Sequence, residues 1–193
     1  QFIEWNYQQE LDWLLLDYPM HEKLREYYAA LNHVYGSYPA LYEIDNSWDG
    51  FKWLNVNDNA LSSIAFLRSA RPEQNSYLIC ACNFIPNEHK NFIIGLPMPG
   101  RLREILSSDD AKFGGSGLHN VKTLRSRNTG FDDLPYSASI DLPPLSAVYF
   151  EYIPERMTEE ELLEIAAHVE SYSNHPIAQS LTCLLYTSLS PRD

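Results

Sequence analysis

The stretch from Ser76 to Phe84 reads Ser-Tyr-Leu-Ile-Cys-Ala-Cys-Asn-Phe and is apolar at both alternating sets of positions. Successive side chains of a strand point to opposite faces of a sheet, so this pattern predicts a central strand that is buried on both faces. Similar short β-rich runs, separated by Gly, Pro, Asn and Asp, extend outward from it between Phe51 and Tyr152. In chain order these runs are FKWLNV, SSIAFLR, NFIIGL, RLREIL, NVKTLR, YSASIDL and SAVYFEY.

About eight short strands at this spacing, with no helical pattern between them, exclude a parallel α/β fold. They predict a mainly β domain, either an antiparallel β-sandwich or a barrel, and we adopt the β-sandwich. An amphipathic helix precedes it, because apolar residues recur at steps of three and four from Met20 to Tyr35. We expect this helix over about residues 20–35, with Gly36 as a left-handed C-terminal cap and Pro39 as a stop.

Composition narrows the classes of partner. The chain has 193 residues, of which 26 are acidic and 14 basic, and its formal net charge is −12. This charge repels phosphate backbones and anionic lipid, so we expect no nucleic-acid partner and no membrane partner. The first residues show neither an initiator Met nor a signal-peptide pattern, and we therefore expect an N-terminally truncated, cytoplasmic chain.

The texture changes near Ile153, where the sequence becomes acidic and helical. Thr158 and Glu161 form a capping box, and apolar residues follow from Leu162 at helical spacing. A second helix is expected to begin near Pro176. This change of composition predicts a boundary, followed by a short helical C-terminal appendage.

Most candidate chemical motifs have a structural explanation. Cys80 and Cys82 share one strand face, but without a further pair or a nearby His they predict buried small residues and no zinc site. Gly114 to Gly117 lacks the following Gly-Lys-Ser/Thr of a phosphate loop and predicts a turn. The six histidines are scattered without a recognisable nucleophile motif, and no pair of carboxylates can be placed across a cleft. We therefore expect no metal site and no cofactor.

Aromatic residues concentrate at the start of the chain and leave two interpretations open. Sugar rings stack on such faces while carboxylates bind their hydroxyls, but the same rings could pack the helix onto the sandwich. The residues concerned are Trp5, Tyr7, Trp13, Tyr18, Tyr38, Tyr42, Trp48 and Trp53, interleaved with Asp12, Asp17 and Asp45.

Several motifs occur in a fixed order that resembles one enzyme family. They are Glu4–Asn6, Leu11–Trp13, Phe51–Leu54, Ile64–Arg68, Cys82–Pro86, Pro99–Gly100, Arg103–Leu106, Gly114–Gly117 and Leu142–Leu145. With this order and spacing, residues 1–152 resemble the C-terminal part of 1,4-α-glucan branching enzymes. The resemblance implies the end of a (β/α)8 barrel over residues 1–50 and a C-terminal β-sandwich over residues 51–152.

The resemblance also implies an activity, namely cutting an α-1,4-glucan and transferring the piece to a 6-hydroxyl. The catalytic Asp and Glu of that family lie upstream of the position matched by Gln1, so we expect this chain to be inactive alone and to need the missing barrel as a partner. Glu4, Trp5 and Trp13 match a loop near the donor glucan and are implied to bind substrate. The alternative is a non-catalytic module that binds glycogen, amylose or amylopectin.

Residues 153–182 resemble a different family, the nucleotide-binding domain of heavy-metal-transporting P-type ATPases. Met157–Leu163 and Ser171–Ala178 carry this resemblance, in which His175 and Pro176 match the adenine-binding pair. About 30 residues cannot bind ATP alone. Residues 183–193 resemble translated sequencing-adapter sequence, so we expect a chimeric reading frame joined near Tyr152.

Overall fold

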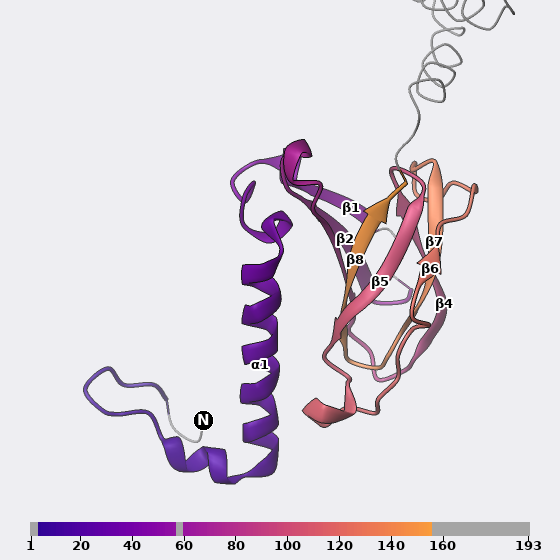
Figure 1. Cartoon of the computed structure of the whole chain (residues 1–193). Helices are drawn as coiled ribbons and strands as arrows, with labels where there is room; N and C mark the ends of the chain where they lie inside the picture. Colours follow the sequence, from indigo (N-terminus) through magenta and orange to yellow (C-terminus); the bar gives the residue numbers. More distant parts are fainter. Residues whose placement is uncertain (1–3, 57–59, 156–193) are drawn as a thin grey trace, which may run out of the picture. The chain divides into compact units, whose positions relative to one another are not determined.

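The computed structural model describes residues 4–56 and 60–155. Within these ranges the chain forms one α-helix, several 3-10 turns and eight strands (Figure 1). The chain divides into Gln1–Pro154 and Glu155–Asp193, and the second unit lies outside the described residues apart from Glu155. The appendage helices expected after Ile153, and His175 and Pro176 with them, therefore also lie outside the described residues.

The strands form two antiparallel sheets. The larger sheet has the order β1-β2-β3-β8-β5-β6, and β4 pairs with β7 in the smaller one (Figure 1). The strand bounds are β1 Phe51–Asn55, β2 Ser63–Ser69, β3 Tyr77–Asn83, β4 His89–Leu96, β5 Gly100–Ser107, β6 Leu124–Arg125, β7 Tyr136–Leu142 and β8 Ala147–Pro154. The prediction of a mainly β antiparallel sandwich is confirmed.

β3 lies inside the larger sheet, between β2 and β8, as its continuous apolar pattern predicted. Side chains from its inner face, including Ile79 and Ala81, meet Ile94 of β4 and Ile140 of β7 in the main hydrophobic core. These four residues are at most 1% exposed. Burial of apolar area between the sheets is the dominant stabilising contribution in such a layered domain.

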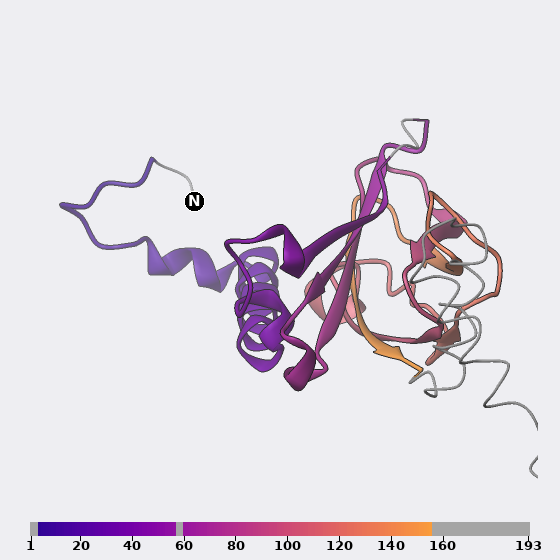
Figure 2. The same cartoon turned by 90° about the horizontal axis from the view of Figure 1, so that it is seen from above.

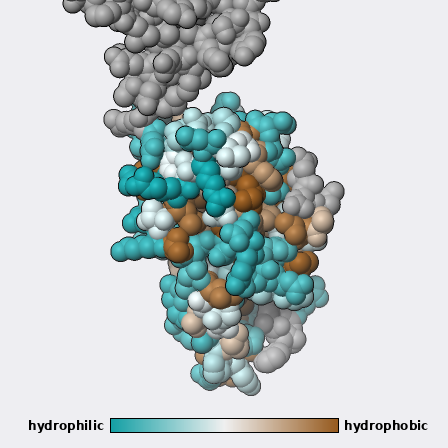
Figure 3. All heavy atoms as spheres, turned by 90° about the vertical axis from the view of Figure 1, so that its right-hand side faces the viewer, coloured by the Kyte–Doolittle hydropathy of each residue, from teal (hydrophilic) through white to brown (hydrophobic). Residues whose placement is uncertain are grey.

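The outer face of the smaller sheet is turned to solvent. Figure 3 views the molecule from that side and shows mostly hydrophilic side chains with apolar ones scattered among them. The strands alternate accordingly, since β7 exposes Asp141 between the buried Ile140 and Leu142. This face therefore offers no large continuous apolar patch.

Helix α1, Pro19–Ser37, packs on the other side of the larger sheet (Figures 1 and 2). A second hydrophobic cluster joins Val34 of α1 to Leu78 of β3 and Leu106 of β5, and Phe113 closes it from the 3-10 turn Ala111–Phe113. The aromatic ring of Tyr27 meets that of Phe113 edge-on at 5.3 Å. Among the described residues, no helix combines the length and apolar character needed to cross a membrane.

The predicted helix is confirmed, but the predicted role of Gly36 is wrong. The helix continues through Gly36 to Ser37, and the backbone N–H of Tyr38 closes it by donating to the Val34 carbonyl. Tyr38 precedes Pro39, which excludes helical backbone at that position, and Tyr38 is extended with φ −116° and ψ 103°. Proline therefore ends this helix, without a left-handed glycine.

Candidate functional site

A groove forms where the segment before α1 folds back along the first turns of the helix. We call it the N-terminal groove; its volume is about 380 Å³. Its lining includes Glu4, Trp5, Glu10, Asp12, Trp13, His21, Leu24, Arg25 and Tyr28. The structure thus brings together Glu4, Trp5 and Trp13, the residues implied by the resemblance.

Local chemistry shapes this groove. The Asn6 carboxamide oxygen accepts from the Gln8 amide at 3.0 Å, and this interaction turns the chain back after Trp5. A 3-10 turn, Trp13–Asp17, follows, and Tyr18 is extended because Pro19 comes next. Proline at the first helical position then starts α1.

The groove combines exposed aromatic surface with charge of both signs. Trp5 is 65% exposed and Trp13 62%, so neither ring is used to pack the helix onto the sandwich. Arg25 forms an ion pair with Glu22, and the hydrogen bond from the Arg25 guanidinium lowers the pKa of the Glu22 carboxyl. Such a surface suits a neutral polyhydroxy ligand, whose C–H faces stack on rings while its hydroxyls meet charged groups.

A second aromatic surface lies at the edge of the larger sheet. Its rings belong to Trp48, Phe51, Trp53 and Phe66, which we call the aromatic cluster. Phe51 is at its centre, 4.8 Å from Trp53 and 5.3 Å from Phe66 between ring centroids. Trp48 is 79% exposed and Trp53 42%, and they line a shallow hollow of about 400 Å³.

Arg68 holds the loop that carries Trp48. Its guanidinium donates to the carbonyls of Gly50 and Ile44 and pairs with the Asp45 carboxylate at 2.9 Å. A Cβ at Gly50 would lie 2.2 Å from the Ile44 carbonyl oxygen, so only glycine fits this turn. The loop is therefore braced on the sheet.

The two interpretations of the aromatic residues thus apply to different rings. Tyr38 packs between helix and sheet, as the structural interpretation required. The four tryptophans remain exposed but do not form one surface, since Trp5 and Trp13 line the N-terminal groove whereas Trp48 and Trp53 lie on the sandwich.

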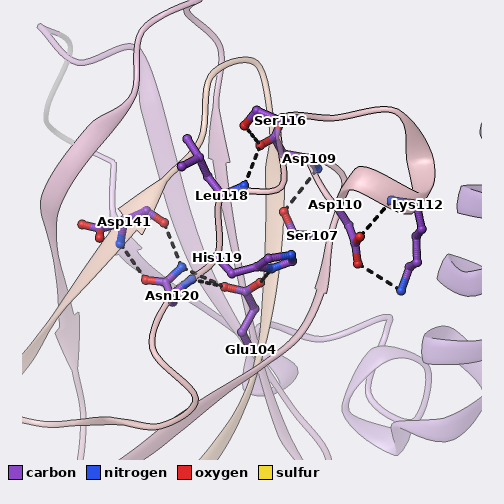
Figure 4. A network of polar contacts seen from close by, with 10 residues as sticks. All are labelled: Glu104, Ser107, Asp109, Asp110, Lys112, Ser116, Leu118, His119, Asn120 and Asp141. Carbon is purple, nitrogen blue, oxygen red and sulfur yellow. Dashed lines mark hydrogen bonds and ion pairs between the residues drawn. The ribbon is translucent and has the colours of Figure 1, made fainter.

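The glycine-rich segment after β5 is a turn, as predicted, with Gly114 at φ +92° and Gly117 at φ +78° (Figure 4). Its amides are already bound by Asp109, which accepts from Ser116 N–H at 3.0 Å and Leu118 N–H at 3.4 Å. The Ser116 hydroxyl donates to the same carboxylate. A carboxylate thus occupies the place that a phosphate would need.

Beside this turn, one amide side chain links the two sheets (Figure 4). Asn120 donates to the Glu104 carboxylate at 2.9 Å, and its carboxamide oxygen accepts from the Asp141 amide at 2.7 Å. His119 Nδ1 lies 2.6 Å from the same Glu104. Sequence reasoning missed this network, because its members are 15 to 21 residues apart and follow no local motif.

The histidines are separated in space as well as in sequence. His21 lines the N-terminal groove, His89 Nε2 lies 2.8 Å from the Leu61 carbonyl oxygen, and His119 joins the network of Figure 4. In the described ranges, no three side chains of His, Cys, Asp or Glu come together in a way that could hold a metal ion.

The fold and its two aromatic surfaces define an all-β accessory domain of the amylase type. Residues 53–153 match the family described as alpha amylase, C-terminal all-beta domain, and the chain belongs to this family.

The similar curated proteins are all longer. The chain is 42% identical over 151 residues to the 1,4-alpha-glucan branching enzyme GlgB of Halothermothrix orenii, covering 78% of this chain and 24% of that protein. The enzymes of the same name from Oceanobacillus iheyensis and Synechocystis sp. are 40% and 36% identical over 156 and 148 residues. These matches cover 81% and 77% of this chain, but only 24% and 19% of those relatives.

Proposed function

We propose that this chain is the non-catalytic C-terminal part of a 1,4-α-glucan branching enzyme. Such an enzyme cuts an α-1,4-glucan and transfers the piece to a 6-hydroxyl. The observation that carries the proposal is the 42% identity over 151 residues to the Halothermothrix orenii enzyme. The catalytic groups would come from a (β/α)8 barrel, a fold that needs about 250 residues.

Exposure of the groove carboxylates supports a non-catalytic role. Glu4, Glu10 and Asp12 are all exposed, whereas a glycosidic general acid usually depends on burial to keep its proton at neutral pH. We expect the chain alone to leave the iodine colour of amylose unchanged, while a full-length relative added to a parallel sample lowers it. Loss of colour with this chain alone would refute the non-catalytic assignment.

Within this function, we assign glucan contact to Glu4, Trp5 and Trp13. Support comes from their common position in the N-terminal groove and from the exposure of both indole rings. An affinity gel containing amylopectin tests the assignment, with retardation expected for the natural chain and reduced by Trp5→Ala and Trp13→Ala. Tyr7→Ala is the matched control, because Tyr7 is 77% exposed and is not among the groove-lining residues.

The second candidate is a glucan-binding module without any part in turnover. The aromatic cluster favours it, because Trp48 and Trp53 present ring surface beside the Asp45–Arg68 ion pair. In the same gel, this candidate predicts that Trp48→Ala and Trp53→Ala reduce retardation while the groove variants do not. Phe84→Ala is its control, since Phe84 is 59% exposed and lies outside the aromatic cluster.

The domain boundaries form part of the proposal. Residues 1–50 would close a barrel, and the exposed Tyr7, Leu14 and Met20 would pack against its remainder in the cytoplasm. Residues 51–152 form the sandwich in this assignment. Titrating the chain with a separately expressed barrel from a relative tests the contact, and lack of association by sedimentation would contradict it.

We further propose that residues 153–182 derive from an ATPase-like nucleotide-binding domain and that residues 183–193 are adapter-derived. The end of the family match at residue 153 and the end of the first unit at Pro154 are compatible with this junction. His175 and Pro176 would contact adenine only in the parent ATPase, so ATP should not shift the melting temperature of this chain. Amplification of source DNA across codons 142–177 tests the fusion, and a product would contradict an artefactual join.

A further inference from the structure

Two thiols lie side by side on the outer face of the larger sheet, beyond anything the proposed function uses. In β3, Cys80 pairs with Phe66 of β2 and Tyr149 of β8, and Cys82 pairs with Ile64 and Ala147. Cys80 is 5% exposed and Cys82 is partly exposed, and both thiols are free. Their sulfur atoms are 3.8 Å apart.

The strand geometry opposes a disulfide between them. Residues two apart in a strand have Cα atoms about 6.7 Å apart, at the upper end of the disulfide range of about 4.4–6.8 Å. The sulfurs would also have to approach to about 2.05 Å. β3 is hydrogen-bonded to a neighbour on each side, so the strand cannot shorten without breaking its ladders.

A single atom that bonds to both sulfurs needs no such contraction. Two sulfurs held 3.8 Å apart can each bond to an atom that lies between them, with only side-chain rotation. The surroundings favour an uncharged product, because Cys80 is buried beside Tyr149 and no cationic side chain of the neighbouring strand positions faces it.

The pair also has a built-in order of reaction. The Cys80 thiol donates toward Cys82, which lowers the pKa of Cys82, and this hydrogen bond together with burial raises the pKa of Cys80. The more exposed thiol is thus the better nucleophile, and the second thiol is within reach directly behind it.

We propose that Cys80 and Cys82 form a dithiol site that captures one trivalent arsenical or a similar neutral, trivalent thiophilic centre. The Cys82 sulfur forms the first S–As bond as an As–O bond breaks, and the Cys80 sulfur forms the second. Each thiol proton leaves with the displaced oxygen. With an arsine oxide, the two thiols yield a neutral dithioarsinite and one water molecule, and no electrons are transferred.

The test uses phenylarsine oxide with the full, reduced chain under native conditions, and intact mass spectrometry as readout. We expect one adduct per chain that survives excess 2-mercaptoethanol and is removed by dithiothreitol. Cys80→Ser and Cys82→Ser should each lose this monothiol-resistant adduct completely. Cys183→Ser, which removes the third cysteine of the chain, should retain it.

Circular dichroism melts of both serine variants establish that they fold, so that loss of the adduct is not loss of the domain. Should either variant fail to fold, the corresponding alanine variant takes its place. A monothiol-resistant adduct in a folded Cys80→Ser or Cys82→Ser variant would overturn the proposal. So would an adduct on the natural chain that 2-mercaptoethanol removes.

Discussion

At the scale of single residues, the glycines show how a local choice depends on distant backbone. A methyl group at Gly115 would lie 2.1 Å from the backbone oxygen of Asp109, a clash that no side-chain rotation relieves. We therefore expect Gly115→Ala to lower the free energy of unfolding by about 1–3 kcal/mol, measured by urea denaturation.

Gly36 provides the matched control for this substitution. It lies inside α1, and a Cβ there would meet nothing within 4 Å. Gly36→Ala should raise the free energy of unfolding by up to about 1 kcal/mol, because alanine is the better helix former. Equal stability of Gly115→Ala and the natural chain would show that the turn after β5 is looser than its geometry implies.

At the scale of elements, the attachment of α1 to the larger sheet depends on a small cluster. Phe113 is 9% exposed and packs edge-on against Tyr27. Replacing a buried phenylalanine by alanine costs about 3–5 kcal/mol. We expect Phe113→Ala to lower the melting temperature and to speed hydrogen exchange in Pro19–Ser37 more than in β3.

Leu24→Ala is the control for this element, since Leu24 is on the same helix but 54% exposed. Substitutions at such surface positions usually change stability by less than about 0.5 kcal/mol. Exchange that rises equally in α1 and β3 of Phe113→Ala would mean that helix and sheets unfold as one unit.

At the scale of the whole molecule, exposed apolar side chains and net charge act in opposite directions. Trp5, Tyr7, Trp13 and Leu14 are all more than half exposed, which favours self-association, while the net charge of −12 opposes it. Salt screens the repulsion but not the apolar attraction. We expect light scattering to show a larger average mass at 500 mM than at 50 mM sodium chloride.

Trp13→Lys combined with Leu14→Lys removes two of these apolar groups and should reduce the salt-induced association. Substituting Lys90, which is on the sheet β4–β7, by Gln is a control, because it changes charge without changing the exposed apolar surface. A monodisperse monomer at both salt concentrations would contradict this account of the molecule.

Local patterns in the sequence were sufficient for several elements. The uninterrupted apolar run of β3 predicted its place inside a sheet, and the repeat from Met20 to Tyr35 predicted α1. Both depend on which face of an element is buried, and the spacing of apolar residues in one short segment carries that information. The turn at Gly114–Gly117 was predictable for the same reason.

Only the tertiary structure decided which distant groups meet. It gathered Glu4, Trp5 and Trp13 with Arg25 in one groove and placed Trp48 and Trp53 on the sheet instead. It also put Asn120 between Glu104 and Asp141. Such contacts depend on sheet order and on how the chain crosses between layers, and no periodicity within a single segment encodes them.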